Sequence, residues 1–169
     1  MKKISFLFLT IFLSACAMDA TKKENLEETK LISSFSDKYV GIELNNSYQW
    51  LGIPYAEPPQ GSLRWKAPRA IINQKEAVKA LKLSDSCPQG PSISLDRGGK
   101  GNYTGSEDCL YLNVFTPKKI SSDKKLPVMF WIHGGGNTSG EAASYDFSKL
   151  ASAHDLVIVS INYRLGFLG

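Results

Sequence analysis

The sequence predicts an α/β fold built on a mixed sheet, with a small β-hairpin ahead of it. Two apolar runs near the carboxyl end, residues 128–132 (Val-Met-Phe-Trp-Ile) and 156–161 (Leu-Val-Ile-Val-Ser-Ile), are typical of buried strands. Between them, residues 145–154 place Phe147, Leu150 and Ala151 at helical spacing. A strand, a helix and a second apolar strand in this order indicate a helix packed on a sheet.

The first residues are typical of an export signal. Met1-Lys2-Lys3 precedes an apolar stretch, residues 4–13, that is too short to span a bilayer, which takes about 20 residues. Residues 13–16, Leu-Ser-Ala-Cys, resemble the bacterial lipobox, in which the signal is cleaved before a cysteine whose thiol carries a lipid. We expect a signal peptide over residues 1–15 and a lipid on Cys16, as in an exported lipoprotein of the outer membrane or facing the periplasm. The alternative is an ordinary signal cleaved near residues 15–17, which gives a secreted protein.

Residues 16–38 are predicted to form a flexible tether, and residues 39–169 the globular domain. The tether carries charges of both signs and few large apolar side chains, so it cannot bury enough surface to offset its chain entropy. A short amphipathic helix over residues 21–32 is the alternative. The formal net charge of +4 includes lysines of the signal, and no basic stripe interleaved with aromatic residues indicates a nucleic-acid partner.

Three elements are predicted between the tether and the apolar strands. Residues 39–44 and 47–53 predict a β-hairpin, because Asn45 and Asn46 tolerate the positive φ of a type I′ turn. Residues 57–61, Glu-Pro-Pro-Gln-Gly, predict a rigid loop, and residues 110–116 predict a strand. The later helix would be capped by Ser144 or Asp146.

The most informative feature is the run His133-Gly134-Gly135-Gly136 directly after the strand at 128–132. Glycines there permit positive φ and let the backbone approach a ligand without interference from a Cβ. Main-chain N–H groups released by such a turn can face a developing negative charge, as in an oxyanion hole. His-Gly-Gly-Gly after a strand is the oxyanion motif of lipases and esterases with the α/β-hydrolase fold. A phosphate site is a weaker interpretation, because residues 134–140 fit neither the dinucleotide nor the Walker pattern.

Four motifs in order carry a resemblance to one family. They are residues 52–65 (Gly-Ile-Pro-Tyr-Ala-Glu-Pro-Pro-Gln-Gly-Ser-Leu-Arg-Trp), residues 106–114 (Ser-Glu-Asp-Cys-Leu-Tyr-Leu-Asn-Val), the triple glycine and residues 162–166 (Asn-Tyr-Arg-Leu-Gly). Together they resemble the type-B carboxylesterases, which include the cholinesterases and the bacterial para-nitrobenzyl esterases. The resemblance covers residues 39–169 and only the amino-terminal portion of that family. It implies an incomplete α/β-hydrolase sheet, a small-molecule carboxylic ester as substrate of the complete protein, and no cofactor or metal.

The resemblance assigns Gly135 and Gly136 as backbone donors of an oxyanion hole, whereas the catalytic triad is missing. No Gly-x-Ser-x-Gly pentapeptide occurs in the 169 residues, and residues 136–140 come nearest with a serine one position late. The triad follows the order serine, acid, histidine in this fold, so His133 is interpreted as a brace for the turn. We expect the amino-terminal portion of a lipid-anchored serine carboxylesterase, inactive by itself. A non-catalytic, cholinesterase-like binding or adhesion module is the alternative.

The resemblance also implies two structural links. Cys87 and Cys109 hold the positions of a family disulfide, and they form an even pair in an exported protein if Cys16 is lipidated. Two buried free thiols are the alternative. Arg64 and Glu107 hold the positions of a structural ion pair, with an unpartnered surface charge at Arg64 as the alternative.

The missing elements predict an open sheet edge. In the α/β-hydrolase fold, the strand that carries the nucleophile pairs with the strand before the oxyanion turn, so residues 128–132 would lack a neighbour on one side. An exposed edge of large apolar residues favours aggregation. We therefore expect the isolated chain to be marginally stable or unfolded.

Overall fold

The computed structural model describes residues 31–33, 39–72, 76–90, 103–119 and 125–169. The predicted signal peptide, Cys16 and most of the predicted tether lie outside these ranges, and they stay predictions. In the described ranges, no helix combines the length and the apolar character needed to cross a membrane.

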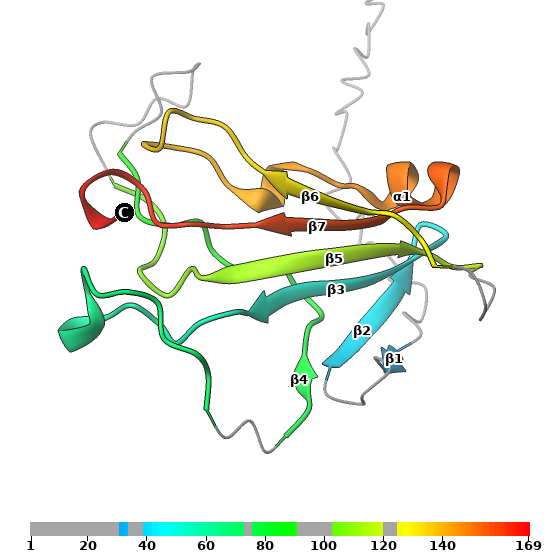
Figure 1. Ribbon diagram of the computed structural model, residues 1–169, viewed down its shortest axis with the longest axis horizontal. Coiled ribbons are helices and arrows are strands. Elements are labelled where there is room, and N and C mark those ends of the chain that lie inside the picture. Colours follow the sequence, from blue (N-terminus) through cyan, green and yellow to red (C-terminus); the bar gives the residue numbers. More distant parts are fainter. Residues whose placement is uncertain (1–30, 34–38, 73–75, 91–102, 120–124) are drawn as a thin grey trace, which may run out of the picture.

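The described residues form a seven-stranded mixed sheet (Figure 1). Its strands are β1 (Leu31–Ser33), β2 (Tyr39–Leu44), β3 (Ser47–Pro54), β4 (Val78–Lys79), β5 (Tyr111–Pro117), β6 (Val128–Ile132) and β7 (Val157–Ile161). They lie in the order β1-β2-β3-β5-β7-β6, with β4 beside β2. Neighbours from β1 to β7 are antiparallel, whereas β6 runs parallel to β7 and β4 parallel to β2. This mixed sheet with few helices confirms the predicted fold class.

The hairpin formed by β2 and β3 is the predicted one. Asn45 and Asn46 have φ of 52° and 60°, and Leu44 pairs with Ser47 across the turn. Two consecutive residues with positive φ are the requirement of a type I′ turn, whose twist matches that of the flanking strands. The two asparagines therefore set this register.

Strand β1 corrects the predicted tether at three residues. Leu31–Ser33 pairs antiparallel with β2, with Ile32 opposite Gly41. The backbone of β2 offers unpaired hydrogen-bonding groups on that side, and a short segment that composition predicts to be solvated can still fill them. The alternative helix over residues 21–32 likewise does not extend through Leu31 and Ile32.

The predicted helix over residues 145–154 begins later than expected. The α-helix α1 spans Ser148–His154, and the preceding segment contains a 3₁₀ helix at Ala142–Ser144 and an extended Tyr145. Asp146 Oδ1 accepts a hydrogen bond from the N–H of Ser148 at 2.9 Å, so this carboxylate satisfies a donor of the first helical turn. Ser144 instead donates to Glu141, and its predicted capping role is wrong.

The apolar core lies between α1 and one face of the sheet. Phe115, Ala151 and Ile158 are buried there, and Phe147 packs edge-to-face on Phe115 with ring centroids 6.0 Å apart. Helix α1 links the parallel strands β6 and β7 and packs against β3 and β5. Helix α1 is thus the crossover between two parallel strands, and the carboxyl ends of β6 and β7 lie side by side.

Strand β6 ends the sheet as an open edge. Its side chains alternate in exposure, and Val128, Phe130 and Ile132 are 65%, 55% and 58% exposed. No described segment pairs with the outer side of β6. The predicted edge of large apolar residues is therefore present in the described part of the chain.

Candidate functional site

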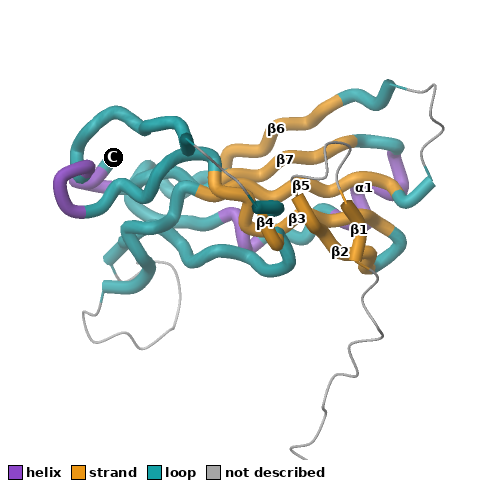
Figure 2. Tube along the Cα trace, turned by 90° about the horizontal axis from the view of Figure 1, so that it is seen from below, coloured by secondary structure: helices purple, strands orange, loops and turns teal. Residues whose placement is uncertain are grey.

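The candidate site lies where β6 and β7 end. Because these strands are parallel neighbours, the segments that follow them leave the sheet at the same end, where the carboxyl ends of both strands lie. The hydroxyl of Tyr163 donates to the carbonyl oxygen of His133 at 2.7 Å, and the two rings stack with centroids 4.3 Å apart. This contact joins the two segments and leaves His133 only 3% exposed. Figure 2 shows long loops gathered at this end of the sheet, where the C terminus also lies.

The imidazole of His133 braces the glycine turn from inside. Its Nδ1 lies 2.9 Å from the carbonyl oxygen of Gly134, and a carbonyl can only accept, so Nδ1 carries the proton. A Cβ on Gly140 would collide with the same ring nitrogen, so the turn folds back onto His133. Nε2 is buried without a hydrogen-bond partner among the described residues. This geometry agrees with the interpretation of His133 as a brace.

The glycine turn needs conformations that other residues rarely adopt. Gly135 and Gly136 have φ of 120° and 61°, and a Cβ on Gly135 would collide with the backbone of Ser139. The carbonyl oxygen of Gly135 accepts the N–H groups of Thr138 at 3.1 Å and Ser139 at 3.2 Å. Thr138 Oγ1 donates to it as well, at 3.0 Å. The turn thus closes on the carbonyl of Gly135.

These contacts orient two backbone N–H groups. In a planar trans peptide, the N–H points opposite to the carbonyl of the preceding residue. The carbonyl of Gly135 is held inside the turn, so the N–H of Gly136 points out of it; the Gly134 carbonyl, bonded by His133, directs the N–H of Gly135 in the same manner. Both glycines are exposed, and neither N–H donates to an acceptor in the described part of the chain. The turn therefore presents two oriented, available donors.

Two contacts from the segment after β7 hold the outer part of the turn. The N–H of Gly166 donates to the carbonyl oxygen of Asn137 at 2.6 Å, and the N–H of Ala142 donates to Asn162 Oδ1 at 2.7 Å. Asn162 is 2% exposed, and its Nδ2 donates to the carbonyl oxygen of Asp85 at 3.0 Å. Residues 162–166, which the sequence presents only as a motif, therefore anchor the turn.

A third anchor, Gln89, has no signal in the sequence. Its side-chain amide bonds the backbone of Gly140, with Nε2 donating to the Gly140 oxygen at 3.1 Å and the Gly140 N–H donating to Oε1 at 2.9 Å. The two residues are 51 positions apart, and no motif in the sequence pairs them. Only the fold brings them together.

Cys87 and Cys109 form a disulfide, as the resemblance implies. Their Cα atoms are 5.0 Å apart across 22 positions of sequence, and both residues are at most 1% exposed. They pack with Ala56, Leu110 and Leu165 in a second apolar cluster. The alternative of two free thiols is wrong.

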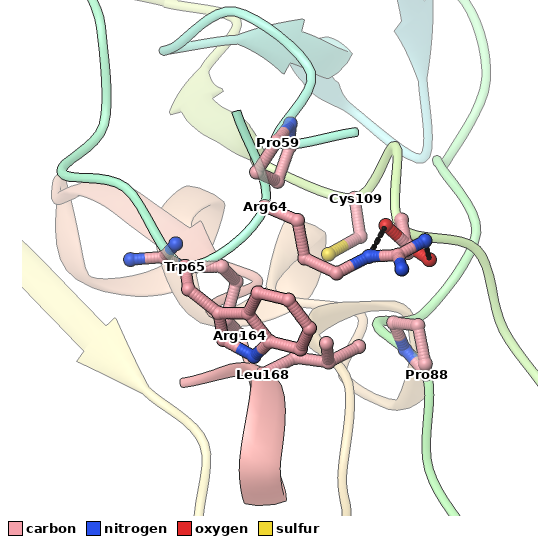
Figure 3. A pocket seen from close by; sticks show the side chains of 8 residues that line it. Pro59, Arg64, Trp65, Pro88, Cys109, Arg164 and Leu168 are labelled. Atoms are coloured by element: carbon pink, nitrogen blue, oxygen red, sulfur yellow. Dashed lines mark hydrogen bonds and ion pairs between the residues drawn. The ribbon is translucent and has the colours of Figure 1, made fainter. Parts of the chain in front are cut away.

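Arg64 and Glu107 form the expected ion pair (Figure 3). Nε of Arg64 donates to Oε2 of Glu107 at 2.9 Å and Nη2 donates to Oε1 at 2.5 Å, a bidentate geometry that fixes both side chains. The hydrogen bonds and charge of Glu107 raise the pKa of Arg64. Trp65 lies beside the guanidinium, with its ring centroid 5.6 Å from Cζ. The alternative of an unpartnered surface charge at Arg64 is wrong.

A separate polar pocket lies around Tyr111. Its lining includes Gly52, Lys82, Asp85 and Asp108. Burial, followed by a hydrogen bond and the charge of Asp108, raises the pKa of the Tyr111 phenol from 10.0 to about 12. Within the described ranges, no group of three or more histidine, cysteine, aspartate or glutamate residues could hold a metal ion.

Comparisons with known proteins agree with this geometry. Residues 36–169 match the carboxylesterase family. The para-nitrobenzyl esterase of Bacillus subtilis (strain 168) is 41% identical over 142 residues, which cover 83% of this chain and 28% of that protein. Liver carboxylesterase 1F of Rattus norvegicus is 34% identical over 184 residues, which cover 98% of this chain and 31% of that protein. A solved structure of PNB esterase is similar with a TM-score of 0.70 at 39% identity, covering 83% of this chain and 29% of the other.

These matches cover most of this chain but only a small part of each relative. The chain spans less than a third of the length of the relatives it matches, whereas the family match takes in residues 36–169 of its own 169. The motifs, the sheet and the sequence identity all indicate the same family. The chain belongs to the carboxylesterase family.

Proposed function

We propose that this chain supplies the oxyanion hole of a serine carboxylesterase through the backbone N–H groups of Gly135 and Gly136. One observation carries the proposal: Gly135 and Gly136 are exposed residues, and their N–H groups are unused within the described residues and oriented by carbonyls that are held inside the turn. Preorganised donors of this kind stabilise the negative charge that develops on the carbonyl oxygen of an ester, and each contributes about 10²–10³ in kcat.

The reaction would be hydrolysis of a carboxylic ester through an acyl-enzyme. A serine oxygen attacks the ester carbonyl, a histidine base takes the serine proton and passes it to the leaving alcohol, and water then releases the acid. Gly-x-Ser-x-Gly does not occur in these 169 residues, so the proposal assigns the nucleophile to sequence outside them. The contribution of this chain is the rigid turn, which is set before substrate arrives.

The same proposal places the protein outside the cytoplasm on a lipid anchor. It is supported by the basic start, the short apolar stretch and Cys16 of the lipobox-like sequence. Radioactive palmitate added to bacteria that express the gene is expected to label the chain, and Cys16→Ser is expected to remove the label. Equal labelling of both forms, or of neither, would contradict the anchor.

A completed enzyme tests the catalytic proposal. It consists of residues 17–169 of this chain joined to the part of the Bacillus subtilis para-nitrobenzyl esterase that follows its matched segment. We expect the completed enzyme to hydrolyse p-nitrophenyl acetate with saturable kinetics. We expect the 169-residue chain by itself to show no activity above a heat-treated control.

Three results would contradict the proposal. Stoichiometric labelling of the 169-residue chain by a fluorophosphonate probe would show that it carries its own nucleophile. A folded completed enzyme that reacts with the probe but does not turn over the ester would show that the turn does not stabilise the oxyanion. A folded completed enzyme without either reaction would favour the non-catalytic binding module.

A further inference from the structure

Gln89 is held by three hydrogen bonds besides those to the glycine turn, two through its backbone and one through its side chain. The backbone N–H and C=O of Gln89 both bond Thr104 at 3.0 Å. Its Nε2 also donates to the carbonyl oxygen of Cys87 at 3.1 Å, and Cys87 is tied to Cys109 by the disulfide. The amide is therefore bonded next to the Cys87–Cys109 disulfide.

From this base the amide clasps Gly140. It donates to the Gly140 carbonyl and accepts from the Gly140 N–H, so both polar groups of that residue are bound by one planar side chain. Gly140 has a φ of 115° and packs so closely on His133 and Gly134 that a Cβ would collide with both. A displacement of Gly140 therefore also disturbs His133, whose ring bonds the carbonyl oxygen of Gly134.

The clasp acts on the donors through the peptide planes. Ser139, directly before Gly140, donates its N–H to the carbonyl oxygen of Gly135 at 3.2 Å. That carbonyl shares a rigid plane with the N–H of Gly136. Releasing Gly140 loosens Ser139 and weakens its hydrogen bond to the carbonyl oxygen of Gly135. Thr138 still donates to that oxygen, so the Gly136 N–H is aimed less firmly than before.

We propose that Gln89 is a positioning residue that locks the glycine turn to the Cys87–Cys109 disulfide loop and thereby aims the backbone donors. This inference rests on the proposed oxyanion role of Gly135 and Gly136. Gln89 touches neither substrate nor donor; it acts through Gly140.

The chemistry of the contact specifies glutamine. The amide must donate to two carbonyl oxygens, of Cys87 and Gly140, and accept one N–H. Leucine at this position removes all three bonds. Glutamate keeps the acceptor but faces two carbonyl oxygens with a negative charge, so we expect Gln89→Glu to be at least as disruptive as Gln89→Leu.

Kinetics of the completed enzyme separate positioning from folding. We expect Gln89→Leu to lower kcat by about 10- to 100-fold while KM changes by less than about threefold, because a misaimed donor acts on the transition state. Active sites are counted by titration with the fluorophosphonate probe, so that unfolded molecules do not enter kcat. Gln49→Leu is the matched control: Gln49 is 3% exposed and bonds the hairpin at Leu44 and Ser47. It is expected to lower the Tm and leave kcat per site unchanged.

Hydrogen exchange of the same completed enzyme tests the clasp without any activity. We expect Gln89→Leu to speed exchange of the Ser139 and Gly140 amides by roughly tenfold or more, while amides of β5 and β7 keep their rates. Unchanged exchange at both residues, or a kcat per site equal to that of the Gln49→Leu control, would overturn the positioning role. If the unsubstituted enzyme is inactive, the proposed function fails by itself, and the exchange rates still decide whether Gln89 holds the turn.

Discussion

The hydroxyl of Tyr163 and the carbonyl oxygen of His133 are joined by a 2.7 Å hydrogen bond, and their rings stack face to face at 4.3 Å. Tyr163 follows β7 and His133 follows β6, so this one contact ties together the ends of two parallel strands. It fixes the first residue of the glycine turn. Because the ring of His133 in turn bonds the carbonyl oxygen of Gly134, the contact supports the orientation of the Gly135 N–H.

Removal of the Tyr163 hydroxyl is expected to weaken the fold at this point. Tyr163→Phe keeps the stacked ring but leaves a carbonyl without its donor, which costs about 1–3 kcal/mol in the free energy of unfolding. Urea unfolding of the completed enzyme measures the loss. Tyr103→Phe is the control, since Tyr103 is 73% exposed. Equal urea midpoints for the two variants would contradict the role of the bond.

Substitutions within the triple glycine are expected to differ sharply. Gly135→Ala puts a Cβ against the backbone of Ser139 at a φ of 120°, so the turn must open. We expect kcat of the completed enzyme to fall by about 10²-fold or more, the loss typical of a removed oxyanion donor. Gly134→Ala meets no atom within 4 Å and needs no positive φ, so its kcat is expected to match the parent. Comparable losses in both variants would mean that the effect is not conformational.

Loss of the disulfide is expected to destabilise the completed enzyme. The Cys87–Cys109 bridge closes a loop across 22 positions, and the chain-entropy account predicts a loss of about 3 kcal/mol when Cys87 and Cys109 are both replaced by alanine. Urea unfolding with and without a reductant measures this term. The reductant should lower the midpoint of the parent and leave that of the double variant unchanged. A parent insensitive to reductant would contradict the prediction.

Tyr111 is expected to make stability fall at high pH. Its folded-state pKa of about 12 lies above the ordinary 10.0, so the folded state holds the phenolic proton more tightly than the unfolded state. The resulting stabilisation is complete below pH 10 and is lost as pH rises from 10 to about 12. Ultraviolet titration of the completed enzyme should show a late-ionising tyrosine that Tyr111→Phe removes. Asp108→Asn should shift the ionisation of this tyrosine to lower pH. An unchanged titration curve in Tyr111→Phe would contradict the assignment.

The open edge of β6 is expected to control the solubility of the isolated chain. Phe130 is 55% exposed on this edge and its neighbours Val128 and Ile132 extend the apolar surface, so the chain should aggregate and lack a sharp thermal transition. Phe130→Lys should reduce light scattering, because a charge on an edge strand opposes pairing. Tyr103→Lys, at an exposed residue away from the edge, should not. A soluble monomer with a cooperative transition would refute the expectation.

Much of the local structure can be predicted from the sequence, because it depends on the conformational preferences of neighbouring residues. Asn45 and Asn46 adopt the positive φ that a type I′ turn requires, and the apolar run at 128–132 is strand β6 with the predicted limits. Gly135 and Gly136, which follow this strand, adopt the positive φ that glycine permits. Such features involve a few consecutive residues, whose side-chain volumes and backbone freedom decide the outcome.

Two features could not be predicted from local conformational preference, because they depend on residues distant in the sequence. The composition of residues 31–33 predicts a solvated segment, yet they form strand β1, because β2 offers an unpaired backbone. Gln89 belongs to no motif, and its amide acquires a role only because the fold places Gly140 beside it, 51 positions away.

The sequence by itself determined strands β2, β3, β5, β6 and β7 to within one residue at each end, the turn at Asn45 and Asn46, and the glycine turn after β6, but neither β1 nor β4. The tertiary structure alone decided that β7 lies between β5 and β6, that Tyr163 therefore meets His133, and that Gln89 reaches Gly140. The physical reason is the distance along the chain over which each interaction acts. Backbone torsions and apolar periodicity act within a few residues, whereas strand order and side-chain contacts are chosen by packing and hydrogen-bond satisfaction over the whole domain.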